Sequence, residues 1–288
     1  MDGRPTVARV AGTDIPLLTW TTQVANVNQS FNHFSSIAFS ATTNTAAVMG
    51  VGGTDVEFHR CQFISTNAAS GGVAFRTTGS RTMLSCCYFS ATTSGQAAVR
   101  ANSAGSHYVG CCIEGGLAGI EVDNSPMSVM GCLIRNQATY AISFITSSGT
   151  NYVIVGNTID NPGTDGIRFA VTTNQATIAN NIITNCPGVG INNSSGINNC
   201  RFMRVANLFF NCATNESGLG DDASFDGQTD GSTPYTVAGS DYMPVATSNA
   251  RANGAPGRFE GPSLPQVSAM EIGAFQRPDA IGFLLVSN

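Results

Sequence analysis

Two carboxylates on one short segment are the residues in this chain best suited to do chemistry. Glu121 and Asp123 stand two positions apart, so both side chains leave the same face of an extended strand. Hydrolysis of a glycosidic bond uses two carboxyl groups about 5 to 9.5 Å apart, and this spacing is near the lower end of that range. Asp165 is a more distant third carboxylate. These three residues are the candidate catalytic residues of a polysaccharide-cleaving enzyme.

The elements that must position them follow from a ladder of recurring residues. Every 21 to 26 residues a cysteine or an asparagine returns, and two positions later comes a large apolar side chain. Self-similarity at such a period indicates a solenoid, in which each repeat packs on its neighbours. The seven ladder positions are Cys61, Cys87, Cys111, Cys132, Asn157, Asn181 and Asn207.

The repeat over residues 152–173 indicates how one coil is built. Apolar stretches at 152–155, 158–159 and 166–170 predict three short strands, separated by Gly, Asn and Pro at the turns. Such strands become buried only when coils stack into parallel sheets about 4.8 Å apart. We therefore predict an all-β, three-sheet parallel β-helix of about eight coils. At the ladder positions we expect asparagine to bond the next corner, and cysteine to fill the same volume without the amide's hydrogen bonds.

The repeat pattern also sets the predicted domain boundaries. Residues 1–33 are expected to cap the first coil, 34–213 to form the β-helix, and 214–288 to close it. We expect the closing segment to fold back over the last coil or along the side of the solenoid. Arg204 stands where the pattern expects an apolar residue, which indicates either a shift in register or the end of the solenoid.

Composition excludes several classes of function. Only 11% of the residues are charged, the net charge is −5, and the 13 basic residues are all arginine. The absence of lysine excludes a lysine Schiff base and a Walker-type phosphate loop, and the acidic balance disfavours nucleic-acid binding. No apolar run of membrane-spanning length and no secretory signal is visible. Nine cysteines are present, and we favour a stack of buried free thiols that act as small apolar fillers. Disulfides are the alternative, although the count is odd and the domain is not small.

Two repeats carry a family resemblance. The segments V-x-G-C-x-I at 129–134 and IVGNTIDN at 154–161, with the asparagine positions, resemble the coil consensus of the pectate-lyase-like right-handed parallel β-helix superfamily. The resemblance covers about residues 30 to 212. The tail, at 240–242, 254–257 and 271–275, is similar to the closing segment of bacterial and phage β-helix proteins of unassigned role. The superfamily includes polysaccharide lyases, hydrolases and surface or virion proteins without known activity, so the fold does not choose the function.

The resemblance implies a groove along the outer face of one sheet, which we assign to the third strand of each coil. Residues following the inward-facing apolar positions then form one outward column. Polar and mixed in charge, the column is suited to line an extended glycan; it comprises Arg76, Arg100, Glu121, Ser143, Arg168 and Asn192. Ion pairing of Glu121 with Arg100 is the structural alternative to catalysis, and we favour it.

Sequence signatures of the enzymes in the superfamily are missing. The Gly-His-Gly and Arg-Ile-Lys motifs of polygalacturonases and the Arg-x-Pro-x-x-Arg motif of pectate lyases do not occur. We therefore predict a rigid, non-catalytic structural or glycan-binding module displayed on a virion or cell surface. The alternative is a polysaccharide hydrolase or lyase that uses Glu121, Asp123 and Asp165.

The sequence gives weaker indications of ligands and partners. We expect no cofactor; Asp222, Asp226 and Asp230, with Asp221, are Ca²⁺ candidates. They lack the spacing of a calcium loop, so a solvated acidic turn is the favoured interpretation. The expected partner is a surface polysaccharide, with no nucleic acid and no membrane insertion. Assembly into a homotrimer or a larger particle is a further expectation.

Overall fold

The structure is a computed structural model that describes residues 6–9, 16–20 and most of 25–250. Within 25–250 the residues left out are 43–46, 67–71, 93–95, 103–104, 124–125, 147–150, 172–174, 196–200, 220–223, 226–227, 230–231, 238–240 and 246. Every regular element in the described part is a β-strand. No helix in that part is long and apolar enough to cross a membrane.

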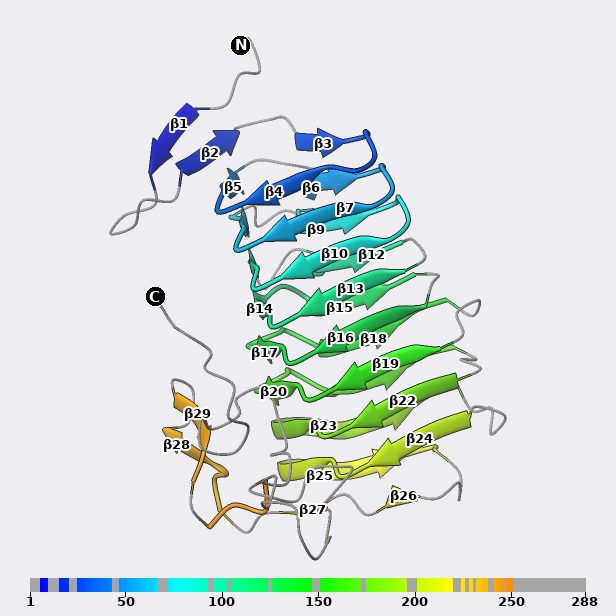
Figure 1. Cartoon of the computed structure of the whole chain (residues 1–288). Coiled ribbons are helices and arrows are strands. Elements are labelled where there is room, and N and C mark those ends of the chain that lie inside the picture. The colour runs from blue at the N-terminus through cyan, green and yellow to red at the C-terminus, as the bar shows by residue number, and fades with distance from the viewer. Residues whose placement is uncertain are drawn as a thin grey trace, which may run out of the picture.

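The strands stack as a parallel β-helix of about seven turns (Figure 1). This confirms the predicted all-β solenoid with slightly fewer coils than the eight expected. At the C-terminal end of the stack, the two-residue strands β26 (Ser224–Phe225) and β27 (Gln228–Thr229) pair with β24 (Arg201–Val205) and β25 (Leu208–Ser217).

Three parallel sheets form the walls. Sheet 1 contains β3 (Ala25–Val27), β6 (Ala47–Val51), β9 (Val73–Thr77), β12 (Val99–Ala101), β15 (Ala118–Val122), β18 (Tyr140–Phe144) and β21 (Ile167–Phe169). Sheet 2 contains β2 (Pro16–Trp20), β5 (Ala38–Ala41), β8 (Gln62–Ser65), β11 (Tyr88–Ala91), β14 (Cys112–Gly115), β17 (Leu133–Arg135), β20 (Thr158–Asp160) and β27. The long strands β23 (Ile182–Asn193) and β25 (Leu208–Ser217) run through both sheets.

Sheet 3 forms the remaining wall. It contains β4 (His33–Ser35), β7 (Val56–His59), β10 (Thr82–Ser85), β13 (Ser106–Val109), β16 (Met127–Met130), β19 (Tyr152–Val155), β22 (Gln175–Ala179), β24 (Arg201–Val205) and β26. Outside the stack, β1 (Thr6–Arg9) pairs antiparallel with β2, and β28 (Tyr235–Val237) pairs antiparallel with β29 (Asp241–Pro244).

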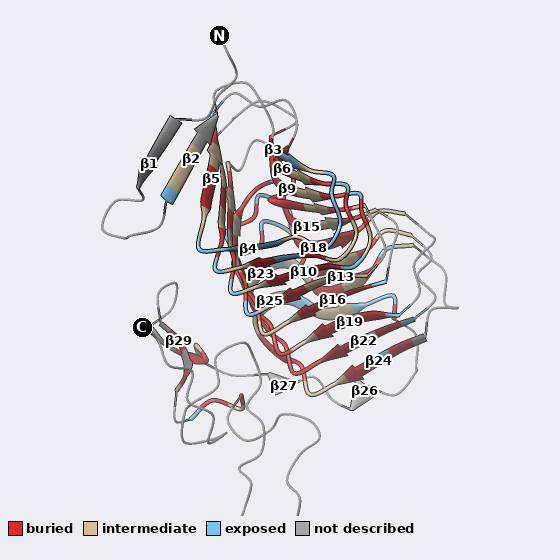
Figure 2. Cartoon of the chain, turned by 45° about the horizontal axis from the view of Figure 1, so that its top comes forward, coloured by how far each residue is buried: buried red, intermediate tan, exposed pale blue. Residues whose placement is uncertain are grey.

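The core is a single apolar column inside the three walls. In many strands, such as β7, β10 and β13, inward-pointing residues are buried while their neighbours remain partly exposed, and other strands such as β20 are buried throughout (Figure 2). Equivalent side chains of neighbouring coils stack on each other; for example, the Phe63 and Phe89 rings lie 5.2 Å apart and those of Phe144 and Phe169 4.5 Å apart. Apolar side chains within one coil also pack on each other, as Phe58 does on Phe63 and Phe75, and the stacking on the coils above and below holds each sheet in register.

The predicted ladder runs through the interior corner between sheets 3 and 2. Asn157, Asn181 and Asn207 each donate an Nδ2 hydrogen bond of 2.9 Å to a carbonyl in the coil before, at Val129, Ile154 and Ile178. Their Oδ1 atoms accept the backbone N–H of the preceding ladder residue, at 2.9 to 3.1 Å. Each amide therefore satisfies buried backbone groups that have no strand partner.

The cysteine half of the ladder corrects one expectation. The thiols of Cys61, Cys87, Cys111 and Cys132 contact the equivalent carbonyl oxygens of the coil before, at 3.4 to 3.6 Å. They therefore continue the asparagine donor pattern as weak S–H donors rather than filling volume alone. Cysteine suits this corner because it is compact and tolerates burial. All eight described cysteines are free thiols; Cys86 is exposed, and Cys112 and Cys212 are half-buried.

Arg204 marks the closing end of the core without a shift in register. It pairs in register with Ile178 of the coil before, so it occupies an inward position. Its side chain is only 6% exposed and forms an ion pair with Glu216, which itself pairs in register with the buried Ile191. Two inward apolar residues of one coil are thus replaced by an ion pair in the next. Of the two alternatives that the sequence left open, the structure supports the end of the solenoid.

Candidate functional site

The outer face of sheet 1 brings the predicted column together. Consecutive strands align Arg76 with Arg100, Arg100 with Glu121, Glu121 with Ser143, Ser143 with Arg168, and Arg168 with Asn192. Toward the N-terminus the column continues through Gly50 to Asn26. Its residues lie side by side because inward neighbours such as Phe75, Val99 and Ile120 are locked into the core. The column is a polar strip parallel to the axis of the stack.

An acidic pair bridged by one arginine lies at the middle of this column. Arg100 Nε lies 3.0 Å from Glu121 Oε1, and Arg100 Nη2 lies 3.6 Å from Asp123 Oδ2. The Nδ2 of Asn102 donates a hydrogen bond of 2.9 Å to the same Asp123 oxygen. The three charged side chains are 20 to 27% exposed. One guanidinium therefore engages both candidate catalytic carboxylates at once.

The environment of Glu121 changes its proton affinity. Burial raises the pKa of the Glu121 carboxyl, Arg100 lowers it, and the nearby Asp123 charge raises it further, so that the net pKa lies above its ordinary value. A raised carboxyl pKa is what a general acid needs, although it also results wherever a carboxylate is partly buried for structural reasons.

Asp165 does not join this pair. It lies before β21, two coils beyond Glu121, and is 8% exposed. Its Oδ1 accepts the backbone N–H of Val189 at 2.9 Å, and its Oδ2 accepts Nδ2 of Asn192 at 2.9 Å. The carboxylate therefore ties the turn before β21 to the next coil. The same bond engages the amide of Asn192, a candidate glycan-binding residue.

The lower half of the column is held by aromatic and hydroxyl contacts. The Arg168 guanidinium carbon lies 4.6 Å above the centre of the Tyr140 ring, and Arg168 Nε donates to Ser194 Oγ at 3.2 Å. Nη1 of Arg168 also donates to the Tyr140 hydroxyl. Ser143, between Glu121 and Arg168, is only 3% exposed, which leaves little of it for a ligand.

An open hollow of about 270 Å³ lies at the N-terminal end of the same face, where Arg76 meets β3 and β6. It is lined by Asn26, Asn28, Ala47, Gly50, Val51, Gly52, Arg76 and Thr78. Gly50 occupies a column position without a side chain. A Cβ there would approach Asn26 Oδ1 to 2.4 Å, so the Asn26 amide lies directly against this glycine.

A second asparagine column was missed by the sequence analysis. Asn136, Asn161, Asn185 and Asn211 occupy the turn after each sheet 2 strand segment, with φ between 52° and 61°. Asn161 donates to Asn136 at 3.0 Å, and Asn211 donates to Asn185 at 2.9 Å. Asparagine tolerates this left-handed conformation better than most residues. The signal that predicts the column is simple, because each member stands four residues after a ladder position.

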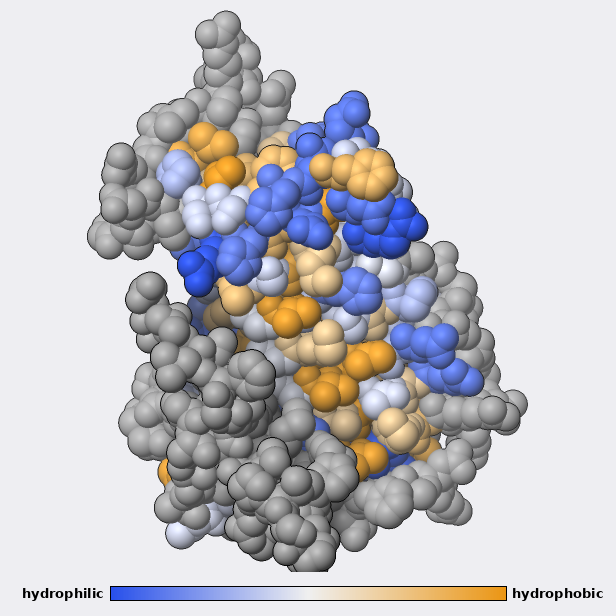
Figure 3. Space-filling model, viewed as in Figure 1, coloured by the Kyte–Doolittle hydropathy of each residue, from blue (hydrophilic) through white to orange (hydrophobic). Residues whose placement is uncertain are grey.

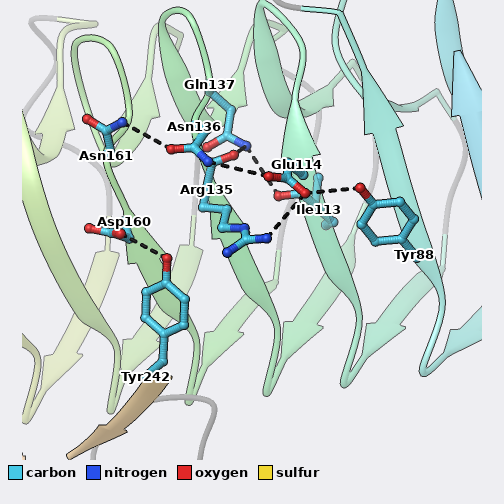
Figure 4. A network of polar contacts seen from close by, with 9 residues as sticks. All are labelled: Tyr88, Ile113, Glu114, Arg135, Asn136, Gln137, Asp160, Asn161 and Tyr242. Carbon is cyan, nitrogen blue, oxygen red and sulfur yellow. Dashed lines mark hydrogen bonds and ion pairs between the residues drawn. The ribbon is translucent and has the colours of Figure 1, made fainter. Parts of the chain in front are cut away.

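The hairpin formed by β28 and β29 packs on the outer face of sheet 2. Tyr235, Tyr242 and Ala250 form a small apolar cluster with Leu133, Ile182 and Leu208 of that sheet. The Tyr242 hydroxyl donates to Asp160 Oδ2 at 2.9 Å, beside a polar network of Tyr88, Glu114, Arg135 and Asn136 (Figure 4). This part of the closing segment therefore lies along the side of the solenoid.

Removing the Tyr242 hydroxyl is expected to loosen this hairpin. Burial raises the pKa of Tyr242 to about 12, so the phenol stays a donor to the buried Asp160 carboxylate at neutral pH. Tyr242→Phe should cost about 1.5–3 kcal/mol, the usual value of a hydrogen bond to a charged group. The control is Tyr235→Phe, whose hydroxyl meets the neutral Thr184 Oγ1 at 3.1 Å, with an expected cost of about 0.5–1.5 kcal/mol. Urea unfolding and limited proteolysis of the hairpin measure both; equal costs would contradict the role of Asp160.

The structure does not describe the candidate calcium ligands. Asp221, Asp222, Asp226 and Asp230 lie outside the described residues. In the portion of the chain that the structure covers, no group of three or more His, Cys, Asp or Glu residues is arranged to hold a metal ion.

The outer face of sheet 3 differs in character from the column on sheet 1. From β13 to β24 its outward positions are mostly apolar, and Figure 3 shows apolar side chains gathered over the middle of this wall below a polar upper part. Val109, Met130, Val155, Ala179 and Val205 form one such line of residues in register. The molecule thus presents a polar column on sheet 1 and an apolar line on the part of sheet 3 from β13 to β24.

The fold and the column together define a protein of the parallel β-helix class. A family model described as "Right handed beta helix region" matches residues 22–215, and the chain belongs to this family. This confirms the right-handed solenoid that the coil motifs predicted. Among solved structures the chain is similar to the crystal structure of pectate lyase Pel9A, with a TM-score of 0.61 and 12% identity. The match covers 91% of this chain and 86% of that one, and at this identity it shows the fold alone. No curated protein matches the sequence.

Proposed function

We propose that this protein is a rigid, non-catalytic structural or glycan-binding module of a cell or virion surface, with the glycan lying along the column on sheet 1. The observation that carries the proposal is the bridge made by Arg100. A side chain that neutralises both Glu121 and Asp123 works against their use as a free acid and base. Asp165 is bound to the backbone of the next coil and serves the turn.

The architecture supports recognition of an extended polymer. The column presents hydrogen-bonding and charged groups at the spacing of adjacent strands, about 4.8 Å, along the whole stack. Each group is held on a strand whose inward neighbours are fully buried, so the face is pre-organised for a ligand. Display on an exterior surface, and assembly into a homotrimer or larger particle, remain predictions from the sequence; the apolar line on sheet 3 is the surface suited to such assembly.

A second candidate function is a polysaccharide hydrolase or lyase that acts on the same face. Two observations favour it: the raised pKa of Glu121 and the similarity of the fold to a pectate lyase. In that function Glu121 would be the general acid and Asp123 its partner. Arg100 would have to release both carboxylates when substrate binds, which is an extra cost that the recognition function avoids.

Glu121→Gln separates the two functions. Wild type and variant are incubated with a panel of acidic and neutral polysaccharides, and both binding and new chain ends are read by mass spectrometry. We expect binding to at least one glycan and no new ends from either protein. The variant should lose at most about 1 kcal/mol of stability, because the ion pair with Arg100 is partly exposed.

The matched control for Glu121→Gln is a variant of a carboxylate away from the column. Glu57→Gln makes the same change at an exposed carboxylate on sheet 3, paired with His33. New chain ends from wild type and the Glu57 variant that vanish in Glu121→Gln would establish an enzyme instead, and an unsaturated product would make it a lyase. Absence of both binding and cleavage across the panel would leave only the structural role.

A further inference from the structure

The hollow beside Arg76 differs from the rest of the column in its charge balance. Among the described residues no carboxylate lies within ion-pairing distance of Arg76, and its buried Nε meets no acceptor there. The side chain is half-buried, so its charge is only partly solvated. A partly desolvated cation without a counter-ion is a cost to the folded state unless a ligand offsets it.

Most other arginines whose side chains the structure describes have protein partners. Arg81 is held by Asp55 with two contacts of 2.6 Å, Arg100 by Glu121 and Asp123, Arg135 by Glu114, and Arg204 by Glu216. Arg168 stacks on Tyr140, and Arg60 lies exposed on a turn. Arg76 is therefore a half-buried arginine that lines an open hollow and has no ion pair with a described carboxylate.

The space has the chemistry of an oxyanion site. Guanidinium groups bind carboxylates and sulfates through paired N–H donors. The amides of Asn26 and Asn28 line the same hollow and supply further neutral donors, whereas the Thr78 hydroxyl beside them donates to the Val51 carbonyl at 3.2 Å. Arg100 lies in the adjacent coil and adds positive charge on one side, although its own carboxylates offset most of it. Gly50 lets the Asn26 amide lie close against the backbone at the edge of this hollow, because a Cβ at position 50 would approach Asn26 Oδ1 to 2.4 Å.

We propose that the hollow binds one anionic substituent of a glycan, a sulfate or a carboxylate, with Arg76 as its counter-ion. The inference rests on the proposed function, because it assigns the ligand class of the same face. It places the anchoring point at the N-terminal end of the column, with the polymer running from there over Glu121 toward Arg168.

Three dextrans of equal length test the substituent directly: unsubstituted dextran, dextran sulfate and carboxymethyl dextran, with binding measured by biolayer interferometry. The wild type should bind at least one substituted dextran about tenfold or more tightly than dextran, and the tighter of the two identifies the anion. Arg76→Gln should lose about tenfold for that polymer, and Arg76→Lys should retain part of the affinity. Free sulfate should compete with the wild type and not with Arg76→Gln.

The control is Arg81→Gln, which makes the same change of net charge at a site already neutralised by Asp55. Its binding should stay within about twofold of wild type. Equal losses in the Arg76 and Arg81 variants would show general charge attraction and overturn the proposal. No preference of the wild type for substituted dextrans would also overturn it, whereas binding to neutral glycans in the polysaccharide panel would leave the glycan-binding function intact.

Discussion

Replacing Asn181 with alanine should lower the free energy of unfolding by about 3–5 kcal/mol. The change leaves two buried backbone groups without a partner, the N–H of Asn157 and the carbonyl of Ile154, and it removes one of the two donors to Oδ1 of Asn207. Each buried polar group left without its partner costs about 1–3 kcal/mol, and a cavity adds to this. Guanidinium unfolding followed by circular dichroism measures the loss, and hydrogen exchange should show faster exchange at the Asn157 amide.

The cysteine half of the ladder provides the matched comparison. Cys87→Ala removes a thiol that makes weak contacts with the carbonyl oxygens of Phe58 and Ser85, both at 3.4 Å, so its cost should be about 1–2 kcal/mol. Asn181→Cys should fall between the two variants, because a thiol reaches the Ile154 carbonyl and accepts poorly from Asn157. If Asn181→Ala cost no more than Cys87→Ala, the stranded groups would have found other partners, and the amide ladder would not be what secures this corner.

The stacking of the coils was predictable from the sequence, because residues one repeat apart in a parallel β-helix lie next to each other in space. Residues about 24 positions apart become neighbours, so a repeating Cys or Asn predicts a ladder, and the residues after Phe75, Val99 and Ile120 predict a column. The register of Arg100 with Glu121 follows from the same count. The second asparagine column could also have been predicted from the sequence, since Asn161 and Asn185 each stand four residues after the ladder residues Asn157 and Asn181.

Contacts between residues that do not occupy equivalent positions of neighbouring coils could not be predicted from the repeat length. Arg100 reaches both Glu121 and Asp123 because its side chain is long enough to span two positions of the next strand. Asp165 lies in a turn, where side chains do not alternate between two faces as they do in a strand, so the sequence pattern does not predict its bond to the Val189 N–H. The docking of Tyr242 on Asp160 joins residues 82 positions apart with no recurring pattern. Such contacts depend on three-dimensional reach, and only the structure shows them.

Breaking the ion pair at the closing end of the core should be as costly as breaking the ladder. Arg204 is buried, and Glu216→Ala removes the carboxylate that faces it. Removing one partner of a buried pair costs about 3–5 kcal/mol, since the remaining charge keeps its desolvation penalty. The effect should be measured by guanidinium unfolding, with Glu57→Ala as the exposed control that changes stability by less than about 1 kcal/mol.

Replacing both partners should have the opposite result. Burial raises the pKa of Glu216 although Arg204 lowers it, which means that pairing does not fully offset the loss of solvation. An Arg204→Met/Glu216→Leu double variant continues the apolar core of Ile178 and Ile191 and should equal or exceed wild type at pH 7, by up to about 4 kcal/mol.

The stability advantage of the double variant over wild type should increase with pH. Because the folded pKa of Glu216 lies above its unfolded value of about 4.3, the folded state holds the proton more tightly. Glu216 therefore favours folding below that unfolded value, and this contribution is lost as the pH rises through the raised folded value. The double variant lacks the group, so its advantage over wild type should be larger at pH 7 than at pH 4. An advantage that shrank between pH 4 and pH 7 would show instead that Arg204 holds the carboxylate strongly enough to outweigh its burial.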